Sequence, residues 1–95
     1  MQIHFQIEYF TQWGEDIVIH IHQKDGSIKE LQMANDGHGN WYLDFTTHKY
    51  SSLAGNAYHY AVKSHGEIIR HEEGEPHIVP NFNSENIVLA DRWRD

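Results

Sequence analysis

Residues 16–22 read DIVIHIH, and this short stretch decides the fold class. Ile17, Ile19 and Ile21 stand at every second position, so in an extended chain they face one side while the valine and the histidines between them face the other. Isoleucine and valine are β-branched, which favours the pleated backbone of a strand. The stretch therefore predicts a β-strand with one face on a hydrophobic core.

The same alternation recurs along the chain. Turn-forming sequences separate the segments, such as KDGS at 24–27 and NDGHGN at 35–40. No stretch has a convincing helical period, so about seven short strands predict an all-β antiparallel β-sandwich. The six further predicted strands are residues 3–9, 28–33, 41–47, 57–64, 67–72 and 85–93.

Length and composition bound the architecture. A chain of 95 residues holds one core, so residues 1–95 are expected to form a single domain. Aromatic residues make up 13% of the chain, and each ring buries on the order of 150–250 Å². That surface stabilises a core without disulfides, which suits a chain that has no cysteine.

Charge and hydropathy restrict the partners. The formal net charge of −7, with no cluster of Lys or Arg, repels phosphate backbones, so no nucleic-acid partner is expected. The sequence has neither a signal-peptide pattern nor about 18 consecutive apolar residues, so no membrane partner is expected and a cytoplasmic location is favoured. The acidic stretch HEEGE at 71–75 is interpreted as a solvated turn.

Residues that could carry catalysis are sparse. The sequence has no cysteine nucleophile, no GxSxG elbow around the serines and no glycine-rich phosphate loop. We therefore expect that the domain is not an enzyme and needs no cofactor. His20 and His22 share one face of the predicted strand and could bind zinc if a neighbouring strand supplied a third ligand. Histidines on a polar strand face are the favoured interpretation, and no metal is expected.

Among the aromatic residues, Trp13 is the one whose role the sequence leaves open. Trp13 lies in the predicted turn before residues 16–22, where it either covers the end of the sandwich or forms a platform for a ligand. Exposed rings on a β-sandwich suit sugars, whose C–H faces are apolar. The other candidates, Trp41, Trp93, Tyr58 and Tyr60, are predicted to pack in the core.

Four stretches taken together resemble the starch-binding domain of carbohydrate-binding module family 20. They are FQIEYFTQWGEDIVI at 5–19, NWYLDF at 40–45, YHYAVKSHGEIIRHEEGEPHIVP at 58–80 and IVLADRWRD at 87–95. The combination of T-x-W-G-E, W-Y, Y-x-Y and D-x-W-R in this order carries the resemblance, which spans nearly the whole chain. It implies an immunoglobulin-like sandwich with two sites for α-1,4-glucan, each built on aromatic stacking.

The resemblance implies one glucan site around Trp13. In that site the family has an aromatic residue in the turn where this chain has Trp13, and the position that resembles Trp41 lies beside it. Thr11 and Asp36 are the further candidates for contacts with sugar hydroxyls. On this interpretation Trp13 is exposed because glucose rings stack on it.

The second implied site departs from the family pattern. HQKDGSIKEL lacks the tryptophan that the family has after its second strand. HEEGEPH places His71 at the next family tryptophan, Glu72 at the acid and His77 at the arginine, while Lys63 stands near the family lysine. We expect this site to be weakened or lost.

The resemblance also implies a parent protein. The EYFTQWGE and IIRHEEGEP segments are most similar to N-terminal modules of 4-α-glucanotransferases of the amylomaltase and disproportionating-enzyme type. The expected partners are therefore α-glucan chains and a downstream catalytic domain in the same chain. The alternative is a degenerate module that serves as a spacer or interdomain contact with little affinity for sugar.

Overall fold

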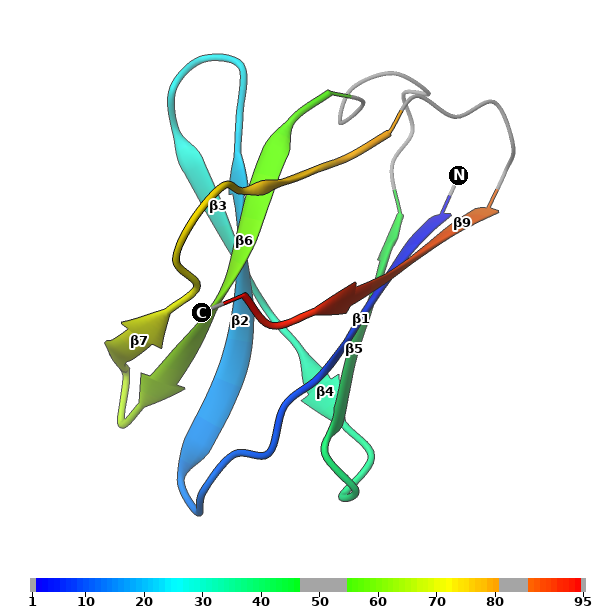
Figure 1. Cartoon of the computed structure of the whole chain (residues 1–95). Coiled ribbons are helices and arrows are strands. Elements are labelled where there is room, and N and C mark those ends of the chain that lie inside the picture. Colours follow the sequence, from blue (N-terminus) through cyan, green and yellow to red (C-terminus); the bar gives the residue numbers. More distant parts are fainter. Residues whose placement is uncertain (1, 47–54, 81–85, 95) are drawn as a thin grey trace.

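Two β-sheets pack face to face in the computed structural model of the protein, which describes residues 2–46, 55–80 and 86–94 (Figure 1). Within these residues the chain forms nine strands and no helix. The predicted all-β sandwich is confirmed. In the described residues no helix is long and apolar enough to cross a membrane.

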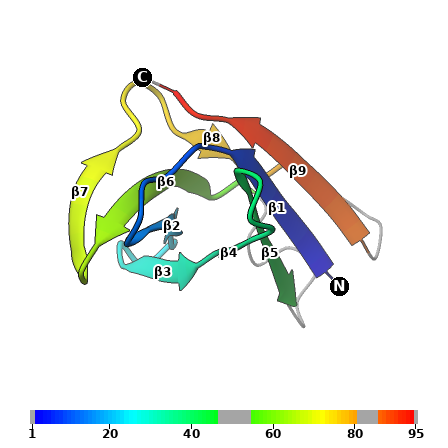
Figure 2. The same ribbon diagram turned by 90° about the horizontal axis from the view of Figure 1, so that it is seen from below.

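The first sheet has the strand order β4-β5-β1-β9. It lies on one side of the sandwich, and Figure 2 shows β1 between β5 and β9. Its members are β4 (Ala34–Asn35), β5 (Asn40–Thr46), β1 (Gln2–Glu8) and β9 (Asn86–Arg92).

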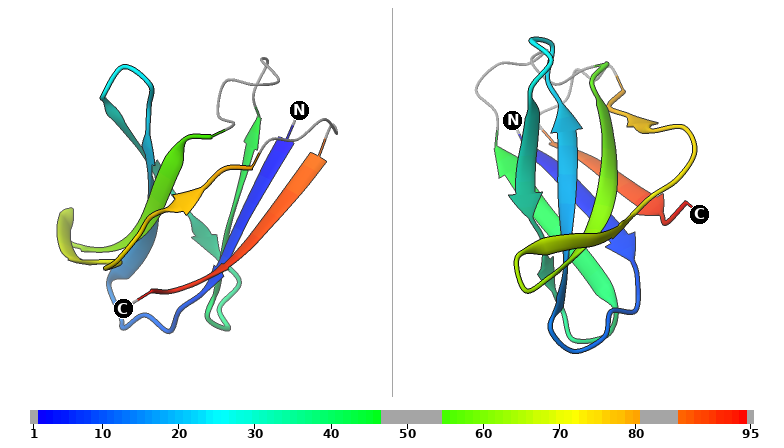
Figure 3. Two further views of the ribbon diagram at one scale, coloured as in Figure 1. Left: turned by 45° about the horizontal axis from the view of Figure 1, so that its top comes forward. Right: turned by 90° about the vertical axis from the view of Figure 1, so that its left-hand side faces the viewer.

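The second sheet has the order β3-β2-β6-β7, and β8 also pairs with β6. The two layers are seen edge-on in Figure 3. The members are β3 (Ile28–Gln32), β2 (Glu15–His22), β6 (Ala57–Ser64), β7 (Glu67–His71) and β8 (His77–Ile78).

The seven predicted strands all form, each within one residue of its predicted bounds. The ends of two of them, residues 47 and 85, lie outside the described residues. The prediction missed β4 and β8, because two residues are too few to show an alternation. The expected all-antiparallel pairing is wrong at one place, since β9 runs parallel to β1. Alternation reports which face of a strand is buried and does not report the direction of its neighbour.

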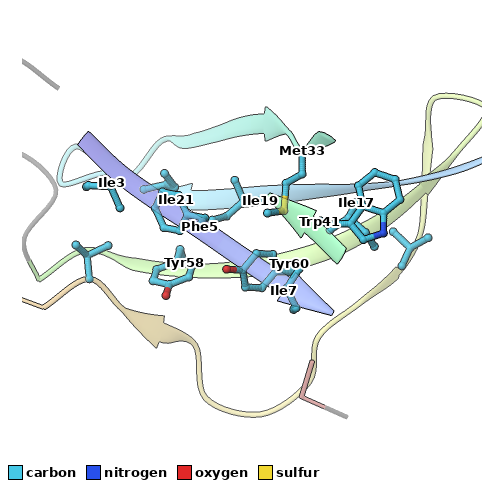
Figure 4. Packing of buried hydrophobic residues seen from close by; sticks show 12 residues of the cluster. Ile3, Phe5, Ile7, Ile17, Ile19, Ile21, Met33, Trp41, Tyr58 and Tyr60 are labelled. Carbon is cyan, nitrogen blue, oxygen red and sulfur yellow. The ribbon is translucent and has the colours of Figure 1, made fainter. Parts of the chain in front are cut away.

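Apolar side chains from both sheets fill the space between the layers (Figure 4). The prediction for residues 16–22 is confirmed, because Ile17, Ile19 and Ile21 are completely buried. Tyr58 and Tyr60 are also buried, as predicted. The remaining members of the buried cluster are Ile3, Phe5, Ile7, Met33, Trp41, Val62 and Val79.

The two core tyrosines connect the sheets through their hydroxyls. Tyr58 and Tyr60 on β6 each donate a hydrogen bond of 2.7 Å to Oδ2 of Asp91 on β9. The pKa of both phenols is raised above the ordinary range, chiefly by their burial and in addition by the carboxylate of Asp91. A buried polar link thus fixes β9 of one sheet against β6 of the other.

Candidate functional site

Trp13 lies at the tip of a tight turn between β1 and β2. The amide of Glu15 donates to the carbonyl of Gln12 at 3.0 Å, and the Glu15 carboxylate accepts from the Gln12 amide at 2.7 Å. Gly14 has a φ of +84°, the conformation that a type II turn requires at its third position. The turn therefore directs the indole outward, and the Trp13 side chain is fully exposed at 101% of its reference area. Of the two alternatives for Trp13, the structure excludes the one that covers the sandwich end.

Phe10 is a second exposed aromatic residue beside this turn, and it was not among the residues predicted from the sequence. It keeps 75% of its surface accessible. One edge of its ring lies against Gly39, where an added Cβ would come within 2.7 Å of Cε1 of Phe10. The amide of Tyr9 donates to the Gly39 carbonyl at 2.9 Å, which joins the end of β1 to the 36–40 turn. The sequence feature that could have indicated Phe10 is its position directly before T-Q-W-G at 11–14.

Asp36 organises the 36–40 turn. Its Oδ1 accepts from the amide of His38 at 2.7 Å, and its Oδ2 accepts from Nδ2 of Asn40 at 2.9 Å. These hydrogen bonds lower the pKa of Asp36 below its usual range, and the bond from the Asn40 side chain has the largest effect. The carboxylate is therefore occupied within its own turn, so its role is to position the turn.

Two adjoining hollows separate the two exposed rings. One has a volume of about 390 Å³ and is lined on one side by Phe10, and the other has about 620 Å³ and is lined by Trp13. Thr11, Asn35 and Gly37 line both hollows, so the two adjoin, with Phe10 in the lining of one and Trp13 in the lining of the other. The predicted residue Thr11 thus lies where the hollows meet, and Asn35 is a further polar side chain there. We call the two hollows together the Trp13–Phe10 groove.

Trp41 lies beneath the groove rather than in it. Only 2% of the residue is exposed, as its core prediction requires. Its Nε1 donates to the carbonyl of Tyr9 at 3.2 Å, and its edge reaches the hollow beside Phe10. Trp41 therefore holds the chain that leads to Phe10 and Thr11.

The residues of the second implied site do not assemble into a comparable groove. Lys63 forms an ion pair of 2.8 Å with Glu30 on β3. His71 lines a hollow of about 370 Å³ with His22, His59 and the 72–76 segment, and Lys63 is not part of that lining. None of these residues supplies an exposed aromatic platform like Trp13.

Glu72 corrects the interpretation of residues 71–75 as a solvated turn. Its side chain is 3% exposed, so the stretch 71–75 is no uniformly solvated turn and the carboxylate cannot reach a ligand. It accepts hydrogen bonds from the Tyr60 amide at 2.8 Å, from Nε2 of His77 at 3.0 Å and from the Arg94 amide at 2.9 Å. Glu72 therefore holds the end of the chain against β6. The solvated-turn interpretation holds for Glu73, which is exposed.

Among the described residues, His20 and His22 do not gain the third ligand that a zinc site would need. Nε2 of His20 is hydrogen-bonded to the Glu30 carboxylate at 2.9 Å. Nε2 of His22 is hydrogen-bonded to Nδ1 of His59 at 3.2 Å. Within residues 2–46, 55–80 and 86–94 no group of three or more His, Cys, Asp or Glu side chains is arranged to hold a metal ion. In this region His20 instead bridges β2 to β3.

Comparison with known proteins identifies the fold. No protein-family model and no curated protein sequence matches the chain. Among solved structures, it is similar to part of a γ-CGTase from alkalophilic Bacillus clarkii, with a TM-score of 0.70 and 11% identity over 99% of this chain. It is also similar to part of a family 15 glucoamylase from Hypocrea jecorina, with a TM-score of 0.66 and 17% identity over 100% of this chain.

The matched region is a small part of each of those proteins. The chain spans 15% of the γ-CGTase and 17% of the glucoamylase. At these identities the similarity establishes a shared fold. The chain therefore shares a β-sandwich fold with one part of a γ-CGTase and one part of a glucoamylase.

Proposed function

We propose that this domain is a non-catalytic module that binds α-1,4-glucan chains in the Trp13–Phe10 groove. The observation that carries the proposal is the complete exposure of Trp13 at the tip of an ordered turn. Phe10 is exposed as well and lines the same groove, and apolar surface gathered at one place marks a binding site, whereas a single exposed ring does not. The shared fold with part of a γ-CGTase and part of a glucoamylase supports a glucan as that ligand.

The groove suits a sugar chain chemically. Its two rings offer flat apolar surfaces for the C–H faces of glucose, while Thr11 offers its hydroxyl to the sugar hydroxyls. Oδ1 of Asn35 accepts from the Gly37 amide at 2.8 Å, so Asn35 offers chiefly its Nδ2 donor. Stacking contributes about 0.5–1.5 kcal/mol per aromatic pair beyond area burial, so two rings give weak binding. Weak binding is useful in a module tethered to an enzyme, because the tether raises the local concentration of the glucan.

The parent protein is a further part of the proposal. The resemblance of EYFTQWGE and IIRHEEGEP supports a cytoplasmic 4-α-glucanotransferase with its catalytic domain downstream. In such a protein the module would hold malto-oligosaccharide or glycogen-like chains near the active site.

The second candidate function is a structural spacer. It is favoured by one observation, namely that Glu72 and Lys63 of the second implied site are used in internal contacts. A module that has lost one site by such changes can lose the other as well.

Isothermal titration calorimetry with maltoheptaose separates the two candidates. We expect saturable binding by the wild-type domain, none by Trp13→Ala, and partial retention by Trp13→Phe, which keeps a flat ring. Ile69→Ala is a matched control, because Ile69 is also exposed but lies on β7. The absence of heat from the wild-type domain at millimolar sugar would reject the glucan module and favour the spacer.

A further inference from the structure

The outer face of the first sheet carries a hollow that lies apart from the Trp13–Phe10 groove. It has a volume of about 370 Å³, and we take as its floor Ile7, Trp41 and Asp91, which lie on three adjacent strands and turn their side chains toward the core. These strands, β5, β1 and β9, lie side by side in Figure 2. The remaining lining residues alternate with the floor residues, and they are Gln6, Glu8, Asn40, Tyr42 and Ala90.

The walls of this hollow combine one aromatic ring with polar groups. Tyr42 is 44% exposed, and it stands directly across β1 from Ala90, with Gln6 between them in register. The small side chain of Ala90 leaves open space opposite the ring. Among the described residues the side chains of Gln6, Glu8 and Tyr42 form no hydrogen bond or ion pair, so their polar atoms are available to a ligand.

This chemistry favours a neutral polyhydroxylated ligand. A tyrosine ring takes the apolar face of a sugar, and amide and carboxylate groups take paired hydroxyls. Glu8 and the absence of a basic residue from the lining disfavour an anion. A purely apolar ligand would leave the polar groups of Gln6 and Glu8 buried and unpaired.

The hollow and the Trp13–Phe10 groove share one lining residue. Trp41 borders this hollow and the one beside Phe10, and the 36–40 turn stands between the two. A chain that passes the Phe10 ring and follows that turn arrives at Asn40 and Tyr42. We therefore propose that Tyr42, Gln6 and Glu8 form an extension subsite for the same α-glucan chain, which rests on the proposed function of the groove.

Calorimetry with two chain lengths tests this subsite. If Tyr42 contacts only the distal units of a long chain, Tyr42→Ala and Gln6→Ala weaken maltoheptaose binding, by about three- to tenfold for the ring. Maltotriose, if it occupies the Trp13–Phe10 groove alone, then binds the variants as it binds the wild type. Val88→Ala is the control, because Val88 is 58% exposed on β9 and does not line the hollow.

The outcomes distinguish the subsite from the groove. Unchanged maltoheptaose affinity in Tyr42→Ala, with binding lost in Trp13→Ala, would overturn the subsite and leave the groove standing. Failure of the wild-type domain to bind either sugar would overturn both. Amide chemical shifts of the wild-type domain give a second measurement that needs no variant: maltoheptaose should move Gln6 and Ala90 and maltotriose should not, whereas shifts at neither residue with maltoheptaose would overturn the subsite.

Discussion

The ring of Phe10 lies against the backbone of Gly39, so closely that no side chain fits between them: an added Cβ would stand 2.7 Å from Cε1. Gly39 also has a φ of +87°, where residues with a side chain are strained. This contact fixes one wall of the proposed glucan groove.

We expect Gly39→Ala to weaken glucan binding by displacing Phe10, and to destabilise the fold by about 1–2 kcal/mol through backbone strain alone. Calorimetry with maltoheptaose and urea unfolding measure the two effects separately. Gly26→Ala is the matched control, since Gly26 has a φ of +90° but no atom within 4 Å of an added Cβ. Equal glucan affinity in both variants would show that the position of Phe10 is irrelevant to binding.

Asp36 should act on binding through the shape of its turn. Because its carboxylate accepts from His38 and Asn40, Asp36→Ala frees the 36–40 turn and lowers glucan affinity less than Trp13→Ala does. Asp36→Asn retains an acceptor for the His38 amide and should recover part of the affinity. Calorimetry with maltoheptaose gives the order of the three variants, and a loss in Asp36→Asn as large as that in Trp13→Ala would instead indicate direct contact with sugar.

Glu72 should contribute to stability and not to sugar binding. Removing its buried carboxylate leaves His77 and two backbone amides without their acceptor, so Glu72→Ala is expected to lose about 3–5 kcal/mol of unfolding free energy. Glu73→Ala, at an exposed neighbour, should change it by about 0.5 kcal/mol or less. Urea unfolding measures both, and comparable stability of the two variants would contradict the assignment.

His59, which lies close to His20 and His22, is expected to make the folded protein less stable in acid. Burial first, and then the nearby His20 and His22, lowers the pKa of His59 below its ordinary value of 6.5. The unfolded chain therefore binds more protons than the folded one between the two pKa values, so stability is full above pH 6.5 and falls as the pH decreases below it.

Urea midpoints between pH 8 and pH 5 measure this effect. We expect the midpoint to fall on the acid side for the wild type and to fall less for His59→Gln. His38→Gln, which changes an exposed histidine in the 36–40 turn, should retain the wild-type slope. An identical pH profile for His59→Gln and the wild type would refute the contribution of His59.

The sequence by itself determined the sandwich and its core. Ile17, Ile19 and Ile21 stand at every second position of β2, and this alternation places them together on the core face because side chains on a strand point to opposite faces. It also placed Trp13 in a turn, since Gly14 supplies the positive φ that a turn of this kind requires.

Only the tertiary structure decided how distant residues combine. Glu72 and Asp36 look alike in the sequence, because both are acids in polar stretches. In the structure the Glu72 side chain is buried, whereas Asp36 closes an exposed turn. Phe10 became part of the groove because the 36–40 turn, far along the chain, brings Gly39 beneath it. Local patterns record the environment of one segment, whereas burial and contact depend on which segment packs beside it.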